Sequence, residues 1–212
     1  MELRIPRNGC TQNDELSSEL CNLVGVYDAR SDGTVRCSAN YVPLTPISFL
    51  DRAGIVYRNR VSVVYGDVKF TWKETRERCI RLASALAQLQ ISRGDVVAVL
   101  APNIPAMYEL HFGVPMAGAI LCTLNIRLDS AMVALLLRHS EAKIIFVDYQ
   151  FLHTAQRAFQ ILSNAGTKLP QLILIQEPEQ QAPISSKTNF TQTKDLEYDN
   201  FLAMGKADFE IA

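Results

Sequence analysis

Apolar residues between positions 96 and 175 fall into short runs separated by longer stretches of mixed character. Four runs are apolar almost throughout, namely residues 96–100, 119–123, 144–147 and 172–175. Three amphipathic stretches accompany them, at residues 105–117, 130–139 and 151–165. Strands that are apolar on both faces and alternate with amphipathic helices are typical of a parallel sheet covered on both sides. The pattern therefore predicts an α/β fold, with a mostly parallel sheet and helices on both faces.

A β-hairpin is predicted to precede this sheet. Two strand-like runs, residues 61–65 and 68–72, are separated only by Gly66-Asp67, a pair that favours a two-residue hairpin turn. Before the hairpin, Thr45 and Pro46 fit the N-cap and first position of a helix. We therefore expect a helix and a hairpin ahead of the parallel sheet.

The helix expected behind the hairpin begins with a capping box, in which Thr71 and Glu74 satisfy each other's backbone amides. Its apolar positions follow a helical period: Cys79, Leu82, Ala83, Leu86 and Leu89. The same helix also carries a group of charged residues: Glu74, Arg76, Glu77, Arg78 and Arg81. Mixed charges of this kind predict a solvated face with a few pairs inside the helix.

Two polar stretches lack any sustained period. Residues 1–33 contain turn signals but no helical or strand pattern, which indicates a flexible N-terminal tail. Residues 176–194 are rich in Gln, Pro, Ser and Thr and are predicted to be a surface linker. Residues 195–204 can form one more short helix, with Leu196, Phe201 and Leu202 as its apolar contacts.

Composition excludes some classes of partner. The chain has 212 residues, of which 48% are hydrophobic, and a formal net charge of −1. The hydrophobic content can fill a core, and the charge offers no excess of cations for nucleic acid or an anionic membrane. No apolar run is long enough to cross a bilayer. We therefore expect no nucleic-acid partner and no membrane span.

Cysteine usage and the chain ends bear on location. The five cysteines, Cys10, Cys21, Cys37, Cys79 and Cys122, are widely spaced and contain no C-x-x-C pair, which favours free thiols. The N-terminus has no apolar signal region, and Glu210-Ile211-Ala212 is not a peroxisomal tripeptide. The cytosol is therefore the default expectation for location.

Candidate ligand-binding residues follow the carboxyl ends of three predicted strands: Asn103, Asn125, Arg127, Asp148 and Tyr149. Ligands of open α/β sheets bind at that edge. The same residue types commonly serve local structure instead, and we favour helix capping by Asn103 and loop structure by the others.

Familiar catalytic patterns are not found. The spacing from Gly113 to Gly118 lacks the Lys and hydroxyl of a phosphate loop, and no G-x-G-x-x-G occurs. His111, His139 and His153 fall on separate predicted helices, and Glu109 is only two residues from His111, so packing or surface roles are favoured over metal binding. We assign no catalytic, cofactor-binding or metal-binding residue.

Several strings, taken in order, resemble the adenylate-forming, or AMP-dependent synthetase/ligase, family of acyl-activating enzymes. They are residues 68–75, 91–99, 101–105, 118–119, 124–128 and 144–148. Residues 40–50 are most similar to plant acyl-activating enzymes of the butyrate–CoA ligase type. The resemblance spans residues 34–212, which would make up a truncated N-terminal portion of the adenylate-forming fold.

The resemblance implies a two-step reaction for the full-length family. A carboxylic acid, such as a fatty acid, attacks ATP to give an acyl adenylate, and coenzyme A then displaces AMP. The family's phosphate-binding loop, adenine and Mg²⁺ motif, ribose-binding Asp and catalytic Lys all lie downstream of residue 212, and no position here matches them. ATP, Mg²⁺ and coenzyme A are therefore implied for full-length relatives and not for this chain.

Three interpretations remain open. The chain is a fragment of a carboxylate–CoA ligase that is inactive alone, or a non-catalytic module that pairs with itself or a full-length relative through an open sheet edge. In the third, the reading frame continues and encodes an ordinary ligase. One departure from the family is local: Gln90 stands where the family usually has Gly, which should weaken the end of the preceding helix.

Overall fold

The computed structural model describes residues 44–176 and 196–210, and the side chain of Leu196 is not among the parts described. The predicted tail, most of the predicted linker and Cys10, Cys21 and Cys37 lie outside these residues. Among the described helices, none is both long enough and apolar enough to cross a membrane.

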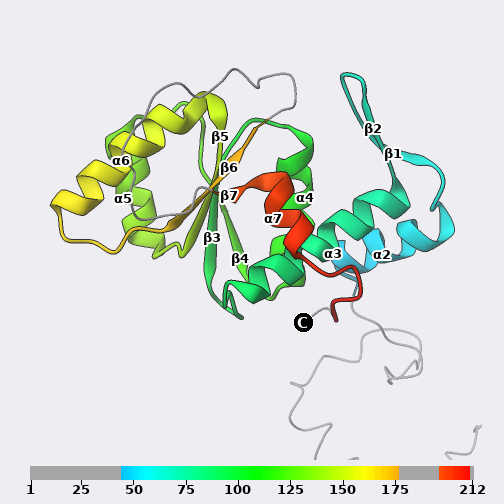
Figure 1. Ribbon diagram of the computed structural model, residues 1–212. Helices are drawn as coiled ribbons and strands as arrows, with labels where there is room; N and C mark the ends of the chain where they lie inside the picture. The colour runs from blue at the N-terminus through cyan, green and yellow to red at the C-terminus, as the bar shows by residue number, and fades with distance from the viewer. Residues whose placement is uncertain (1–43, 177–195, 211–212) are drawn as a thin grey trace, which may run out of the picture. The chain divides into compact units, whose positions relative to one another are not determined.

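Apart from η1 and β7, which were not predicted, the elements follow the order that the sequence pattern predicts (Figure 1). The first part contains α2 (Pro46–Val56), β1 (Val61–Tyr65), β2 (Val68–Thr71) and α3 (Trp72–Gln88). The central part contains β3 (Val96–Leu100), α4 (Pro105–Met116), β4 (Ile120–Thr123), α5 (Ser130–Ser140) and β5 (Ile144–Asp148). The last part contains η1 (Tyr149–Phe151), α6 (Leu152–Asn164), β6 (Gln171–Ile175), β7 (Leu196–Glu197) and α7 (Tyr198–Met204).

The main sheet is parallel, with the strand order β4-β3-β5-β6-β7. Four of its strands are the predicted apolar runs. The fifth, β7, pairs Leu196 with Ile173 of β6 and was not predicted, because two residues are too few to show a period. From β3 the chain first turns to one neighbour, β4, and then crosses to the other, β5. The carboxyl ends of β3 and β5 therefore form the switch point of the sheet.

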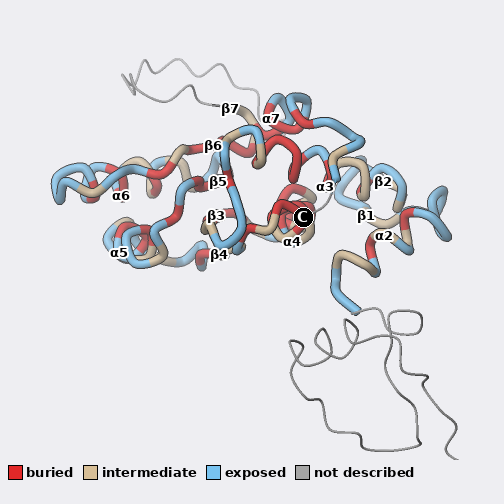
Figure 2. Tube along the Cα trace, turned by 90° about the horizontal axis from the view of Figure 1, so that it is seen from below, coloured by how far each residue is buried: buried red, intermediate tan, exposed pale blue. Residues whose placement is uncertain are grey.

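Two layers of helices cover the sheet, as predicted. Val97, Val99, Ile144 and Phe146 face a core that includes residues of α3, α4 and α7. Ala98, Leu100, Ile145 and Val147, the alternate positions of the same strands, face a core with α5 and α6. Figure 2 shows buried residues along the central strands and exposed ones on the outer helix surfaces. The strands are apolar throughout because both of their faces are covered.

The hairpin of β1 and β2 is antiparallel and is anchored to the start of α3. Thr71 caps α3, with its hydroxyl accepting from the amide of Glu74 while the Glu74 carboxylate accepts from the amide of Thr71, as the capping box predicts. Ser62 of β1 shares a hydrogen bond with the buried hydroxyl of Thr75. These contacts fix the base of the hairpin, whereas its turn is exposed.

Gln90 ends α3 in a left-handed conformation, with φ of 61°. The amide of Ile91 donates to Leu86 O and that of Gln90 donates to Ala87 O, a Schellman motif. Helix α6 ends with the same pair of bonds, but there the left-handed position is Gly166, with φ of 67°. The structure therefore places Gln90 at a left-handed position that favours glycine. This explains why a glutamine here, where the family usually has glycine, should weaken the end of α3.

Candidate functional site

The carboxyl edge of the sheet is the first place to look for a site. Asn103, just beyond β3, does not cap α4: the N-cap is Ile104, and no side chain bonds the helix start. The prediction that Asn103 caps this helix is therefore wrong, because the helix begins one residue later than the cap requires. Asn103 is exposed and, with Tyr108 and His111, borders a cavity of about 410 Å³ between α4 and β1.

The residues after β4 and β5 support their own loops. The side-chain oxygen of Asn125 accepts from the amide of Arg127 at 2.9 Å, which closes an Asx turn. Asp148 is buried and accepts from the amide of Gln150 at 3.0 Å, so it caps η1. The favoured loop roles of Asn125 and Asp148 are thus confirmed. Arg127 and Tyr149 are exposed, and their use stays a prediction.

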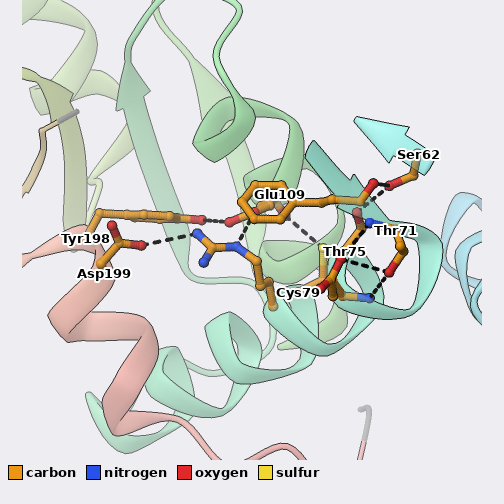
Figure 3. Close-up of polar contacts among 10 residues, drawn as sticks. Ser62, Thr71, Thr75, Cys79, Glu109, Tyr198 and Asp199 are labelled. Carbon is orange, nitrogen blue, oxygen red and sulfur yellow. Dashed lines mark hydrogen bonds and ion pairs between the residues drawn. The ribbon is translucent and has the colours of Figure 1, made fainter. Parts of the chain in front are cut away.

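A buried polar cluster lies between α3, α4 and α7 (Figure 3). Glu109 of α4 has only 1% of its surface exposed. One of its carboxylate oxygens accepts from Nε of Arg78 at 2.5 Å, and the other accepts from the hydroxyl of Tyr198 at 2.7 Å. Arg78 also donates to Asp199 at 3.2 Å and stacks over the ring of Phe70. The cluster joins residues from three helices that are far apart in sequence.

The charges in this cluster are bound to one another. Burial raises the pKa of Glu109, and its hydrogen bonds to Arg78 and Tyr198 act in the opposite direction. Burial acts to lower the pKa of Arg78, but the hydrogen bond and charge of Glu109 raise it overall. Burial, followed by the nearby Glu109 charge, also raises the pKa of Tyr198. Each partner is held by the others, so the arrangement fits a structural ion-pair network better than a proton-transfer site.

The prediction that the charged residues of α3 form a solvated face is therefore wrong for its arginines. Its arginines pair with other elements: Arg76 with Asp51 of α2, Arg78 with Glu109 and Asp199, and Arg81 with the carbonyl of Gly205. Lys73–Glu77 is an exposed pair within the helix, of the kind expected. The period of the sequence places these side chains off the apolar stripe, but it does not show that α2, α4 and α7 lie against that side.

Glu109 is the residue that sequence reasoning missed. It was considered only as a neighbour of His111, whereas the structure buries it and leaves His111 exposed. A signal was available, because Glu109 falls at helical spacing between Ala106 and Gly113, both buried. A single acid on an otherwise apolar helix face indicates a buried partner of opposite charge.

A cavity of about 310 Å³ lies beside the cluster. It is bordered by the hairpin turn, the start of α4, the carboxyl end of β6 and the start of α7. Its charged side chains are Asp67, Arg78 and Asp199, and Arg78 is already paired with Asp199. Among the described residues, no three His, Cys, Asp or Glu side chains gather as a metal-binding group.

The two described cysteines are both free thiols, in agreement with the sequence interpretation. Cys79 is fully buried, and its sulfur contacts the carbonyl of Glu109 at 3.7 Å. Burial raises the pKa of the Cys79 thiol, so this group is not a reactive nucleophile. Cys122 is half-buried on β4.

Comparison with known proteins gives one consistent family. A family model described as AMP-binding enzyme matches residues 50–204. Probable acyl-activating enzyme 21 of Arabidopsis thaliana is 51% identical over 179 residues, covering 84% of this chain and 31% of the relative. The peroxisomal trans-cinnamate:CoA ligase of Petunia hybrida is 46% identical, over 84% of this chain and 32% of the relative. The peroxisomal butyrate–CoA ligase AAE11 of Arabidopsis thaliana is 47% identical, over 82% of this chain and 30% of the relative.

Solved structures show the same fold. The anthranilate CoA ligase AuaEII, in complex with anthranoyl-AMP, superposes with a TM-score of 0.66 at 21% identity, over 78% of this chain and 29% of that one. A benzoate CoA ligase from Burkholderia xenovorans LB400 superposes with a TM-score of 0.63 at 17% identity, again over 78% of this chain and 29% of that one. The chain thus spans about a third of the length of its relatives. Since the family model covers most of the described sheet and both helical layers, the chain belongs to the AMP-binding enzyme family of acyl-activating enzymes and CoA ligases.

Proposed function

We propose that this chain is part of an ATP-dependent carboxylate–CoA ligase, and that the 212 residues do not make acyl-CoA by themselves. The observation that carries the proposal is the match to the family over residues 50–204 by a chain that covers only 31% of its relative. The acids in the relatives' names are small and varied: butyrate, trans-cinnamate and benzoate. The acid class of this chain's own ligase is therefore a small carboxylic acid, to be fixed by experiment.

The geometry of the carboxyl edge supports the second half of the proposal. Holding a triphosphate requires convergent donors, such as a nest of backbone amides together with a cation or Mg²⁺. Asn125 and Asp148 are engaged by their own loops, and Asp148 carries a charge that repels phosphate. Arg78 is engaged by two carboxylates. The described residues therefore offer Arg127 as a cation at this edge without a surrounding cradle.

The reaction test supplies the purified chain with ATP, Mg²⁺ and coenzyme A, and with butyrate, benzoate or trans-cinnamate in turn. Pyrophosphate release should equal that of a blank without protein, while a full-length relative assayed in parallel turns over. Acid-dependent release by the chain alone would overturn the proposal. Acyl-CoA formation, measured separately, identifies which half of the reaction takes place.

A second candidate function is an interaction module, which the open edge at β4 favours. In the described part of the sheet no strand lies beyond β4, and Ile120 on this strand is 54% exposed. Exposed edge strands pair with other strands. Sedimentation of the chain, alone and mixed with a full-length relative, tests this function. A monomer that ignores the relative at every concentration would contradict it.

A further inference from the structure

Strand β4 presents its free hydrogen-bonding groups in a pattern set by its pairing with β3. The amide of Ile120 donates to Asp95 O and the amide of Leu124 donates to Val99 O. In a parallel ladder, every second residue turns its amide and carbonyl to the same neighbour. Cys122, between these two, therefore also bonds β3, and the amides and carbonyls of Leu121 and Thr123 point away from it.

This outward pattern is self-complementary. When a second β4 runs antiparallel, Leu121 of one copy meets Thr123 of the other, and the reverse, so the outward groups form two closed pairs. That register gives four hydrogen bonds. If the second copy shifts so that Leu121 pairs with Leu121 instead, Thr123 no longer faces a residue of the second β4. The centre of this register is Cys122, which faces Cys122 of the second copy as a non-hydrogen-bonded pair. We propose that a second copy of this chain docks antiparallel on β4 in this register, with Cys122 on the two-fold axis.

The surroundings of β4 suit this occupant. Residues 119–124 carry no charge and no proline, so the edge lacks the usual devices that prevent pairing, and two copies do not repel each other there. Among the described residues no strand pairs with the outer edge of β4, which leaves its hydrogen-bonding groups open on that side. The strand has only four residues, so the dimer is expected to be weak and to form at high protein concentration. The inference rests on the interaction-module proposal above and specifies its partner and register.

Thiol mapping tests the register. Non-hydrogen-bonded residues of antiparallel strands lie with Cα atoms about 4.5 Å apart, within the range of a disulfide. In a background with Cys10→Ser, Cys21→Ser and Cys37→Ser, the thiol oxidant diamide should link two copies through Cys122, taking two electrons and two protons from the two thiols. Buried Cys79 remains in all variants as an internal control.

The matched control moves the thiol to a residue that is more exposed but lies away from the two-fold axis. In the same background with Cys122→Ser, Ile120→Cys places a thiol at a more exposed site that the register keeps about 14 Å from its symmetry mate along the strand. The register predicts several-fold more linked dimer through Cys122 than through Ile120→Cys. The reverse order would show random collision and overturn the proposal.

Thr123→Pro supplies a readout without cysteine chemistry. Its amide points away from β3, so proline removes a donor from the outer edge and leaves the β3–β4 ladder intact. Sedimentation should show a loss of dimer with an unchanged circular dichroism spectrum. Association that persists in Thr123→Pro and does not link Cys122 overturns this register but leaves the interaction module standing. A chain that stays monomeric but binds a full-length relative overturns the second copy as partner, and one that binds neither overturns both.

Discussion

The hydroxyl of Tyr198 donates to Glu109 at 2.7 Å across 89 positions of sequence, and through this bond α7 is joined to α4. Arg78 of α3 bonds the same carboxylate, so three helices meet at one buried acid. The consequences of this contact for stability can be measured directly.

Glu109→Ala should destabilise the fold by about 3 kcal/mol, because it leaves Arg78 and Tyr198 without their shared acceptor in a buried site. Urea unfolding followed by tryptophan fluorescence measures the loss. Glu77→Ala is the matched control, since Glu77 of α3 forms an exposed ion pair with Lys73 and its loss should change stability by less than about 0.5 kcal/mol. Equal effects of the two substitutions would contradict a special role for Glu109.

Gln90→Gly should stabilise the fold by about 0.5–1 kcal/mol, because it relieves a left-handed conformation that costs an L-residue with a side chain. Gly166→Gln makes the reciprocal change at the end of α6 and should destabilise the fold by a similar amount. A Cβ at Gly166 meets nothing within 4 Å, so the backbone conformation is its only cost. Thermal unfolding of both variants compares them, and changes of the same sign would refute the explanation.

Gly205→Ala should weaken the docking of α7 on α3. A Cβ at this position would lie 1.9 Å from the carbonyl oxygen of Arg81, which is backbone and cannot move aside alone. The expected loss is about 1–3 kcal/mol, as in other overpacked sites. Hydrogen exchange should show faster opening of residues 198–204. Ala203→Ser, an exposed neighbour, is the control and should leave the exchange rates unchanged.

The hydrogen bond from Lys143, and then the amide of Ser92, lower the pKa of Asp95 to about 2 from its ordinary value of 3.8. Because the folded pKa lies below the unfolded one, this carboxylate contributes stability above pH 3.8 that is lost as the pH falls towards 2. Carbon-13 NMR titration should place its midpoint near 2. In Lys143→Ala, which removes the 2.7 Å ion pair, the midpoint should rise. An unchanged midpoint would assign the shift to Ser92 alone.

Much of the fold follows from local signals. Thr71 and Glu74 mark the start of α3, and fully apolar runs mark four strands of the sheet. These signals are strong because capping and two-sided burial act on neighbours in sequence. Strand β7 left no signal, since its pairing with β6 depends on where residues 196–197 meet the sheet and not on their own pattern.

The polar interior was harder to predict. The sequence shows that Arg78 lies off the apolar stripe of α3. The same pattern results whether Arg78 faces solvent or a charged partner on another helix. Asn103 was predicted to cap α4, but it lies one position before the N-cap of the helix that forms. Both outcomes depend on the packing of helices against each other, which local patterns do not specify.

The return of the chain to α3 has a consequence for the order of folding. Arg81 bonds the carbonyl of Gly205 across 124 positions, and the Ser84 hydroxyl accepts from the amide of Lys206 across 122. Such long loops are closed late, because their entropy cost must be met before the contacts form. On the ribosome, the side of α3 that receives α7 therefore stays open until the chain has been synthesised beyond Lys206. During that interval the nascent chain exposes apolar surface that a chaperone can bind.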